Sequence, residues 1–507
     1  MDLTWLLLGL ALLLVLAFLV TRYSAWSVRH VFRDLGIETP PSSVFFGHFL
    51  EGMKYGIFDV QTHQYKMFKD KKVYGVYEFK TPMIVVRDLD LIKDVCVKHF
   101  NNFVDRRVLL NMEPPFHQTL LAILGDHWKK VRSAVSPTFS SGRLKKMCRH
   151  IERNAKSLQL VLDARQESGE EVELKEMMSR LTMDTIAGTG FGLDIDSLRE
   201  PDNEFHTNAQ AFTKPNLAVF IVTLMFPFLG KIMESMGIKF LPQKAADFFE
   251  KVLDNALRER RESENAGKMH DFLDLMLNAE EHGKEGEACD KHEGVGTLTR
   301  NEILSQALVF LLAGYDTVSS VLSFTMFLLA VHPEHQRLVQ EELDKKLPLD
   351  DSIPDYETVQ NLPYLDQCIS ESMRMFPPGL ILDRVCNQEI TLHGVRFPKG
   401  MPVVLPIYAI HMDPDLWENP KDFKPERFSP EAKESQHQYA YFPFGHGPRN
   451  CVAMRLAQLE LKIIIATVLR RFDLTPCQKT VYPVQLSSWQ LAANDGLWVK
   501  PERRATK

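Results

Sequence analysis

The sequence of 507 residues lacks several patterns that would assign it to a familiar class of protein. It contains no CxxC pair and no cysteine–histidine cluster with the spacing of zinc ligands, which excludes the common zinc-binding modules. It has no basic stripe, and its formal net charge of -6 gives no reason to expect a nucleic-acid partner. Neither a GxGxxG fingerprint nor a P-loop occurs. What remains is an ordinary globular composition, 45% hydrophobic and 25% charged, with enough length for a large core.

Cysteine is also sparse and shows no pairing pattern. The chain has seven cysteines, an odd number, and they are scattered along the sequence. Such a pattern is typical of free thiols in a reducing compartment rather than of a disulfide framework. The seven are Cys96, Cys148, Cys289, Cys368, Cys386, Cys451 and Cys477.

The N-terminus carries an uncharged apolar run from Leu3 to Val20. As a helix this run would be roughly 27 Å long, close to the thickness of the hydrocarbon core of a bilayer. A cleaved signal peptide is the alternative, but the run is long for one and no clear cleavage site follows. Arg22, Arg29 and Arg33 come after the run, so the positive-inside rule places the rest of the chain in the cytosol. We therefore expect a transmembrane signal anchor over 1–21, a proline-containing linker over 22–45 and a globular domain over 46–507.

The order of the predicted elements indicates the fold class. Val73–Asp88 alternates and is rich in valine and aromatic residues, which predicts a β-hairpin. Helical patterns dominate from Leu89 to His332, and strand-like runs return at Val395–Pro406 and near the C-terminus. Glu281–Gly296 is polar and contains glycine, so we expect an exposed loop there. The sequence thus predicts a mainly α (α+β) domain with a small sheet region.

One predicted helix is unusually long and apolar. Thr299 and Glu302 have capping-box spacing and Pro333 marks the stop, which predicts a helix over Arg300–His332 of roughly 50 Å. A second transmembrane span is the alternative. The centre of the helix argues for a buried core helix with a functional interruption, since a carboxylate within an apolar helix is costly. The polar or small residues there are Gly314, Asp316, Thr317, Ser319 and Ser320.

A lone cysteine stands where a glycine-rich turn meets a predicted helix, in FPFGHGPRNCVAMRLAQLELK. Gly445 and Gly447 allow the backbone to approach a flat group closely. Arg449 and the helix N-terminus are both expected to lower the pKa of the Cys451 thiol. Four roles for this thiol remain open on spacing alone: a buried core residue, a catalytic nucleophile, half of a disulfide, or an axial thiolate on a metal cofactor.

The loop resembles the haem-binding loop of the cytochrome P-450 superfamily, whose pattern is Phe-x-x-Gly-x-Arg-x-Cys-x-Gly. Phe444, Gly447, Arg449 and Cys451 match it, whereas Ala453 replaces the usual glycine. The resemblance implies that Cys451 is the axial ligand of haem iron, in iron protoporphyrin IX (haem b), and that Phe444 and Arg449 contact the cofactor. A thiolate ligand donates electron density to the iron and favours cleavage of the O–O bond.

The segment AGYDT is similar to the acid–alcohol pair of the same superfamily. The resemblance implies that Asp316 and Thr317 relay protons to dioxygen in a dry pocket, and that the small Ala313 leaves room for oxygen. A hydroxyl beside a carboxylate can carry protons through water. The alternative is that Thr317 only hydrogen-bonds back within its own helix.

Two further charged groups match the superfamily. Glu371 and Arg374, in ESMR, share one helix face, and Arg427 lies in PERF; without the resemblance, the first two would be a surface ion pair. The resemblance implies a buried structural triad of these three residues. It also implies a set of haem contacts, chiefly to the two propionates, since buried carboxylates must be paired; unconnected surface charges are the alternative. That set is Trp128, Arg132, Arg384, Arg449 and Arg106.

Longer stretches, such as LPYLDQCISESMRMFPP, resemble the third P-450 family, of drug- and steroid-oxidising microsomal enzymes. The resemblance implies a monooxygenase of the endoplasmic reticulum membrane. It would insert one atom of dioxygen into lipophilic substrates, with NADPH electrons from a flavoprotein reductase and in some cases cytochrome b5. One alternative is a haem-thiolate isomerase, as in thromboxane synthase of the same clan, which needs no reductase. Another is a haem-binding membrane protein without enzymatic activity, such as a sensor. The pair Asp316–Thr317 favours the monooxygenase over both.

The resemblance also suggests where substrate and partners bind. Val108–Phe116, Leu217–Phe228 and Leu380–Leu382 are nearly all apolar and are expected around the substrate, although each is equally compatible with ordinary core. Leu217–Gly230 is too short to span a bilayer, and it is expected to dip into its surface. A group of basic residues is a candidate docking site for an acidic reductase or a solvated helix face: Lys129, Lys130, Arg143, Lys145 and Lys146.

Overall fold

The computed structural model describes residues 15, 18–20, 22–23, 30–43, 46–107, 116–200, 202–212, 216–262, 272–278, 298–347 and 353–504. Of the predicted membrane helix, only residues 15 and 18–20 are among the described residues. Several residues of the predicted linker also lie outside them. The predicted exposed loop over 281–296 and residues 108–115 of the first predicted substrate segment also lie outside them.

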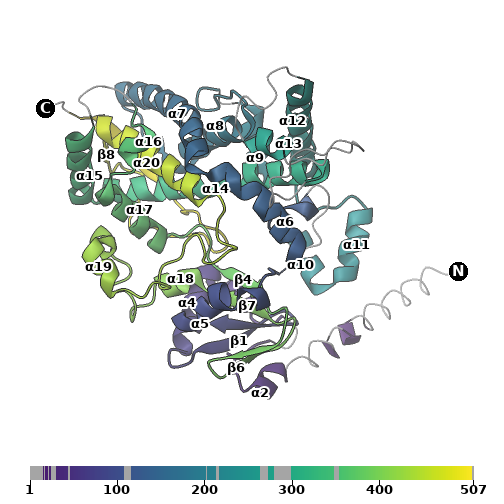
Figure 1. Ribbon diagram of the computed structural model, residues 1–507. Helices are drawn as coiled ribbons and strands as arrows, with labels where there is room; N and C mark the ends of the chain where they lie inside the picture. The colour runs from purple at the N-terminus through teal and green to yellow at the C-terminus, as the bar shows by residue number, and fades with distance from the viewer. Residues whose placement is uncertain are drawn as a thin grey trace, which may run out of the picture.

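The domain has a large helical part and a smaller part built on a sheet, at the bottom of Figure 1. The four-stranded sheet has the order β1-β2-β7-β4, in which β2 runs parallel to β7 and the other pairs are antiparallel. These strands are β1 (Val73–Glu78), β2 (Thr81–Val86), β4 (Leu382–Val385) and β7 (Pro402–Leu405). The predicted hairpin is confirmed as β1 and β2, and most of its side chains are buried because helices and loops cover the sheet.

The other strands form two small sheets. The predicted run Val395–Pro406 divides at Pro398–Gly400, so that its first half is β6 and its second half is β7 of the large sheet. β6 (Val395–Phe397) pairs with β5 (Ile390–Leu392). Near the C-terminus the order is β3-β9-β8, with β3 (Val172–Glu173), β8 (Phe472–Thr475) and β9 (Trp498–Arg503).

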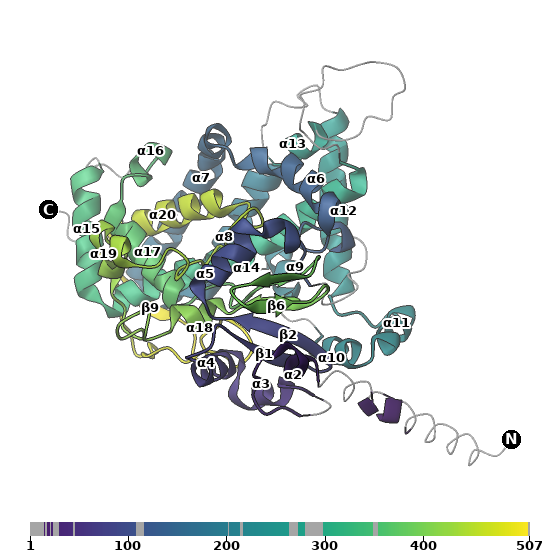
Figure 2. The same cartoon turned by 60° about the horizontal axis from the view of Figure 1, so that its bottom comes forward.

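The long apolar helix is the central helix of the domain. α14 spans Arg300–Val331, begins at the predicted capping box of Thr299 and Glu302, and ends one residue before the predicted boundary. It passes through the middle of the helical part in both views (Figures 1 and 2). Among the described residues it is the one helix long and apolar enough to cross a membrane, and most of that apolar stretch is buried inside the domain. Its burial agrees with the predicted core helix.

Three helices pack extensively on α14. They are α8 (Leu174–Phe191), α17 (Pro363–Met375) and α20 (Met454–Arg471). The remaining helices on the N-terminal side are α2 (Val31–Leu35), α3 (Phe49–Tyr55), α4 (Ile57–Met67), α5 (Leu89–Lys93), α6 (Gly125–Val135) and α7 (Ser141–Ser168). Those that follow α8 are α9 (Glu204–Phe212), α10 (Leu217–Met225), α11 (Pro227–Ser235), α12 (Gln243–Glu262), α13 (Phe272–Asn278), α15 (Pro333–Lys346), α16 (Tyr356–Val359), α18 (Ile407–His411) and α19 (Pro430–Ser435).

The two largest hydrophobic clusters of the described residues hold these parts together. The larger lies among the helices around α14, and the smaller joins the four-stranded sheet to α2, α5 and α18. The six cysteines within the described residues are free thiols, as the scattered pattern predicts, whereas Cys289 lies outside them. The mostly helical domain with small sheets agrees with the predicted class.

Candidate functional site

A cavity of about 520 Å³ lies between α14 and the turn that precedes α20. Its wall is chiefly apolar, and its few polar groups are concentrated in the residues that the sequence analysis selected. Of these, the lining includes Arg106, Trp128, Arg132, Ala313, Thr317, Phe444, Arg449 and Cys451. Residues more than three hundred positions apart in the chain therefore meet around one space.

The turn before α20 is held in place by a close backbone contact. Gly445 and Gly447 have φ angles of 74° and 75°, which residues with a side chain rarely adopt. A Cβ on Gly447 would lie 1.9 Å from the carbonyl oxygen of Cys96, so only glycine fits there. The backbone N–H of Cys451 donates to the Phe444 carbonyl at 2.9 Å, which closes the turn and leaves the thiol on the cavity wall.

The electrostatic surroundings of Cys451 differ from the prediction. Burial raises the pKa of the Cys451 thiol above its ordinary value, and it outweighs the backbone N–H of Ala453, Arg132 and Arg106, each of which lowers it. The expected lower pKa is therefore wrong for the protein alone. The reason is that α20 begins only at Met454, three residues beyond the thiol, and that a low-dielectric wall disfavours a thiolate.

Two of the cavity arginines are already occupied by protein groups. Arg132 donates from Nη1 to the Asn450 carbonyl at 2.9 Å and from Nη2 to the Asn450 side chain at 3.0 Å. Arg449 donates to the carbonyls of Val104 and Ile123, and its guanidinium lies 4.8 Å from the ring centre of Trp128. These two arginines therefore fix the turn to α6 and to the segment before it.

Two other arginines keep donors without a partner. Within the described part of the chain, Nε of Arg106 and both Nε and Nη2 of Arg384 are buried and have no hydrogen-bond partner. Arg384 is fully buried outside the lining, close enough to Arg106 and Arg449 to interact with them electrostatically, and burial lowers its pKa to about 10. Buried charged donors left unsatisfied are costly, so this edge of the cavity fits a bound anion.

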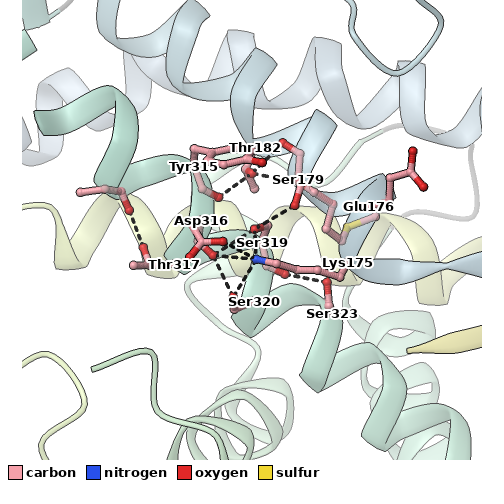
Figure 3. Close-up of polar contacts among 12 residues, drawn as sticks. Lys175, Glu176, Ser179, Thr182, Tyr315, Asp316, Thr317, Ser319, Ser320 and Ser323 are labelled. Carbon is pink, nitrogen blue, oxygen red and sulfur yellow. Dashed lines mark hydrogen bonds and ion pairs between the residues drawn. The ribbon is translucent and has the colours of Figure 1, made fainter. Parts of the chain in front are cut away.

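The predicted acid–alcohol pair is divided between two environments. Thr317 lines the cavity, and its hydroxyl donates to the Ala313 carbonyl at 2.7 Å, which is the back-bonded arrangement of the alternative. Asp316 is not part of the lining; its carboxylate is 2.8 Å from Nζ of Lys175 on α8 (Figure 3). Gly314 lies against Ile186 of α8, where a Cβ would approach to 3.0 Å.

The three residues of the predicted structural triad meet in the structure. Arg374 and Glu371 form a fully buried, two-bond ion pair on α17, and Nε of Arg427 lies 3.2 Å from Glu371. The surface ion pair considered for ESMR is excluded, since neither side chain is accessible to water. Their buried position is tertiary information that the spacing alone does not contain.

The predicted substrate segments contribute unequally to the cavity. Ile381 and Leu382 line it, whereas Phe116 is buried outside the lining and Leu217–Met225 lies elsewhere on the surface of the domain. Several lining residues were not predicted: Leu121, Met147, Ile186, Phe272, Phe310 and Glu460. Most are apolar residues within helices and carry no local signal; the acidic Glu460 within an apolar helix is one that sequence reasoning could have found.

Comparison with known proteins decides the family. A family model described as Cytochrome P450 matches residues 38–500. The chain belongs to the cytochrome P450 family. Cytochrome P450 3A31 of Mesocricetus auratus is 36% identical over 490 residues, which cover 96% of this chain and 93% of that protein. Cytochrome P450 3A7 of Homo sapiens is 37% identical over 488 residues, covering 95% and 93%.

These comparisons confirm the resemblance to the third P450 family that the cysteine loop and its companion motifs predicted. The chain is thus an enzyme of the cytochrome P450 monooxygenase kind, with haem iron as its cofactor. The cavity of this P450 fits such a group: it offers a thiol on one wall, a chiefly apolar lining and unpartnered arginine donors that suit carboxylates. Ala453, in place of the usual glycine, is itself part of the lining.

Proposed function

We propose that this P450 is a haem-thiolate monooxygenase that inserts one oxygen atom of O₂ into lipophilic substrates, including steroids and xenobiotics. The observation that carries the proposal is a single chiefly apolar cavity that combines the Cys451 thiol with a buried, unpartnered donor of Arg106, beside the unpartnered donors of Arg384 outside its lining. An apolar wall of this kind favours substrates that leave water readily. Similarity to several cytochromes P450 3A supports the same substrate class.

The roles of the chain's own residues follow from their positions. When bound, haem supplies the iron at which dioxygen is activated. Cys451 would ligate it as thiolate, and the Ala453 backbone N–H would hydrogen-bond the sulfur, as it does the thiol. Arg106 and Arg384 would bind the carboxylates of iron protoporphyrin IX. Trp128, Arg132 and Arg449 would support that edge, while Phe444 and Ala313 would pack against the ring.

The reaction consumes two electrons and two protons for each O₂, which yields one oxygenated product and one water. We assign proton delivery to Asp316 and Thr317, since Thr317 lines the cavity and the adjacent carboxylate is half accessible to water. The electrons would come from NADPH through a flavoprotein reductase, with cytochrome b5 as a second donor. An isomerase acting on an endoperoxide would need neither, so strict dependence of product on NADPH separates the two activities.

We place the enzyme on the endoplasmic reticulum membrane, held by an anchor over 1–21 and facing the cytosol. Apolar side chains that remain exposed on and after α11 support a second contact with the bilayer: Phe228, Ile232, Met236 and Ile238. Phe228 belongs to the segment selected from the sequence, whereas the other three lie beyond it; most of that segment is α10, which is half-buried. If replacing these four by serine leaves the membrane retention of an anchor-less protein unchanged, this second contact is excluded.

The basic residues selected as a reductase-docking site lie on α6 and α7. Lys129 and Lys145 already form exposed ion pairs, with Asp126 and Glu357 respectively. Exposed pairs are weak, so an acidic partner can displace them. Charge reversal at Lys129 and Lys130 should raise the Michaelis constant for the reductase and reduce its salt dependence; unchanged values would exclude docking at this face.

The first experiment is a difference spectrum of the dithionite-reduced, CO-treated protein in membranes. A strongly red-shifted Soret band is expected if the Cys451 thiolate ligates the iron to which CO binds. A band typical of histidine or thiol ligation, in protein shown to be folded, would contradict the proposal. Turnover with and without NADPH then distinguishes the monooxygenase from the isomerase.

A further inference from the structure

A glutamine on α14 binds the backbone of a segment that forms part of the cavity wall. This wall segment, Phe116–Leu124, begins with a short 3₁₀ turn and ends at the start of α6. The backbone N–H of Leu120 donates to Oε1 of Gln306 at 2.8 Å, and Nε2 of Gln306 donates to the Gln118 carbonyl at 2.7 Å. Nε2 also donates to the Glu302 carbonyl of its own helix at 3.2 Å. The side-chain amide therefore uses its acceptor and both of its donors.

The side-chain amide of Gln306 supplies what the backbone of the helix cannot. Backbone N–H and C=O groups inside an α-helix bond to one another, so they are not offered to a neighbouring segment. Among the described residues, no other group accepts from the Leu120 N–H or donates to the Gln118 carbonyl. Gln306 is fully buried and Leu120 is buried, so water does not readily replace these bonds. Loss of the amide would leave two backbone groups of the wall segment without partners.

The wall segment is attached near its other end to the cysteine turn. Nη2 of Arg449, in that turn, donates to the Ile123 carbonyl at 2.9 Å. Leu120, at the first attachment, and Leu121, between the two attachments, both line the cavity. The wall segment thus extends from α14 to the turn that carries the thiol. Because the first attachment depends on Gln306, this side chain determines where the two leucines lie.

We propose that Gln306 is a positioning residue that determines specificity: it holds Leu120 and Leu121 in one place and so fixes which carbon of a rigid substrate is oxidised. The inference rests on the proposed monooxygenase activity. Gln306 lies outside the cavity lining, so it acts through the wall segment and not by contact with the substrate. A rigid steroid cannot adapt its shape to a wall, and small displacements of a reacting atom have large effects on rate. If the wall segment can move, several orientations fit and one main product is replaced by a mixture.

A second buried glutamine, Gln336 of α15, offers a matched control. Its Oε1 accepts from the Leu474 N–H at 2.8 Å, and its Nε2 donates to the Leu474 carbonyl at 2.9 Å. A third bond, from Nε2 to the Leu329 carbonyl at 3.2 Å, completes the pattern that Gln306 also forms. Neither Gln336 nor Leu474 belongs to the cavity lining. Gln306→Met and Gln336→Met therefore remove equivalent bonds, one set at the wall segment and the other away from it.

A measurement without turnover tests the attachment of the wall segment. In the haem-loaded protein, the Leu120 amide should exchange its proton for deuterium slowly, because it is bonded and buried. Gln306→Met should accelerate this exchange about tenfold or more, whereas Gln336→Met should leave it unchanged. Mass spectrometry with fragmentation to single residues measures the rate. An unchanged rate in Gln306→Met would show that other contacts hold the wall segment, and would overturn the proposal.

The second measurement is the product distribution from progesterone, a rigid steroid, with NADPH and the reductase. The unaltered enzyme should form one main product. Gln306→Met should lower the ratio of that product to all others about threefold or more, and should weaken progesterone binding, read from the Soret shift, several-fold. Gln336→Met should keep the ratio, although urea unfolding shows a similar loss of stability. An unchanged ratio in Gln306→Met, or an equal fall in both variants, would reject the specificity role.

A third variant, Gln306→Glu, tests the same bonds through pH and serves if Gln306→Met does not load haem. A neutral carboxyl group can accept from the Leu120 N–H and donate to the Gln118 carbonyl, whereas a carboxylate cannot donate. Burial beside carbonyl oxygens favours the neutral form. The product ratio of this variant should therefore match the unaltered enzyme at about pH 6 and fall as pH rises toward about 9. A ratio that stays the same across this range would reject the role of these bonds.

Other titratable groups lie near this part of α14 and stay unchanged in every variant. Glu302, one turn before Gln306, caps α14 and contacts His127 of α6. The others are His117 of the wall segment, Arg300 of α14 and its ion-pair partner Asp254 of α12. Because all of them are also present in the unaltered enzyme, its own pH profile is the baseline. The difference between Gln306→Glu and that baseline reports the new carboxyl group alone.

The outcomes separate this inference from the activity on which it rests. If the unaltered protein lacks the red-shifted CO band or forms no product with NADPH, the proposed monooxygenase fails. The exchange rate of Leu120 and the binding of progesterone then still decide whether Gln306 positions the wall segment. If the unaltered enzyme oxidises progesterone and Gln306→Met keeps the product ratio, the role of Gln306 fails alone.

Discussion

The guanidinium group of Arg374 donates two hydrogen bonds of 2.8 Å, from Nε and Nη2, to the two carboxylate oxygens of Glu371. Neither side chain is accessible to water. Glu371 also accepts from the backbone N–H of Lys424 at 3.0 Å and from Nε of Arg427 at 3.2 Å. Nη1 of Arg374 donates to the His411 carbonyl at 2.8 Å. The Glu371–Arg374 pair thus connects α17 to α18, through Arg374, and to the segment that leads toward the cysteine turn, through Glu371.

Glu371→Gln should destabilise the domain strongly, because it leaves the buried guanidinium of Arg374 without a counter-charge. Removal of one partner of a buried ion pair costs about 3–5 kcal/mol. Urea unfolding of the haem-loaded protein measures the change. The matched control is Arg396→Met, which breaks the two-bond pair with Glu389 at an exposed site and should change the free energy of unfolding very little. Equal losses for the two variants would contradict the structural role.

Gly447→Ala should abolish haem incorporation. The new Cβ would lie 1.9 Å from the Cys96 carbonyl oxygen, and the φ of 75° is unfavourable for alanine, so the cysteine turn must move. The measurement is the haem content of the purified protein. Gly142→Ala is the control: its Cβ meets nothing within 4 Å, and within α7 alanine should stabilise the helix by up to about 1 kcal/mol. Normal haem content in Gly447→Ala would disprove the tight approach.

Arg384→Met should have opposite effects on the protein with and without haem. Without haem, the variant removes buried donors that have no partner and should stabilise the fold. With haem, it leaves a carboxylate of the cofactor without its cation, and haem should dissociate at least tenfold faster. Apomyoglobin capture of haem measures the rate, and thermal unfolding of the haem-free protein measures the stability. A loss of stability without any change in haem dissociation would remove Arg384 from the proposed haem contacts.

The stability of the protein should depend on the protonation of Glu460. Burial raises the pKa of this acid from 4.5 to about 8, although the Thr185 hydroxyl lowers it, and its Oε1 has no partner among the described residues. Because the folded pKa lies above the unfolded value, its contribution to stability is complete below about pH 4.5 and is lost as pH rises through 8. Glu460→Gln cannot ionise. As pH rises from 5 to 9, the unaltered protein should therefore lose stability relative to the variant. Parallel urea titrations across this range test the difference, and a constant difference would show that Glu460 does not titrate there.

Thr317→Ala should uncouple NADPH oxidation from product formation and raise hydrogen peroxide several-fold, because the cavity loses the hydroxyl of the proposed relay. Thr317→Ser should retain most of the coupling. The control is Thr325→Val, two turns further along α14, where the hydroxyl is fully buried and has no partner within the described residues. Electron balance among NADPH, peroxide and product measures the coupling. Full coupling in Thr317→Ala would exclude the hydroxyl from proton delivery.

Local features of the fold were readable from the sequence. The capping box of Thr299 and Glu302 starts α14 as predicted, and the alternation over Val73–Asp88 forms the hairpin of β1 and β2. The cysteine turn was recognisable because its glycines satisfy positive φ angles that few other residues adopt. These features depend on backbone dihedrals and on side chains within a few positions, which is the information that a short sequence pattern contains.

Only the tertiary structure decided which group each charged side chain contacts and how deeply it is buried. The resemblance selected four arginines as haem contacts, but it did not show that Arg132 and Arg449 are occupied by protein groups while Arg106 and Arg384 keep donors without a partner among the described residues. It likewise predicted a lower pKa for Cys451, which burial reverses.

Asp316 shows most clearly the difference between what the sequence reveals and what the tertiary structure adds. Its polar place within an apolar helix was evident from the sequence, whereas its partner, Lys175, stands 141 positions away in the chain. Hydrogen-bond partners and burial depend on which distant segments pack together, and the packing of α8 against α14 is the sum of many weak apolar contacts. The sequence by itself therefore determined which residues are expected to carry the chemistry of this P450, and the tertiary structure decided which of them contact other groups of the protein.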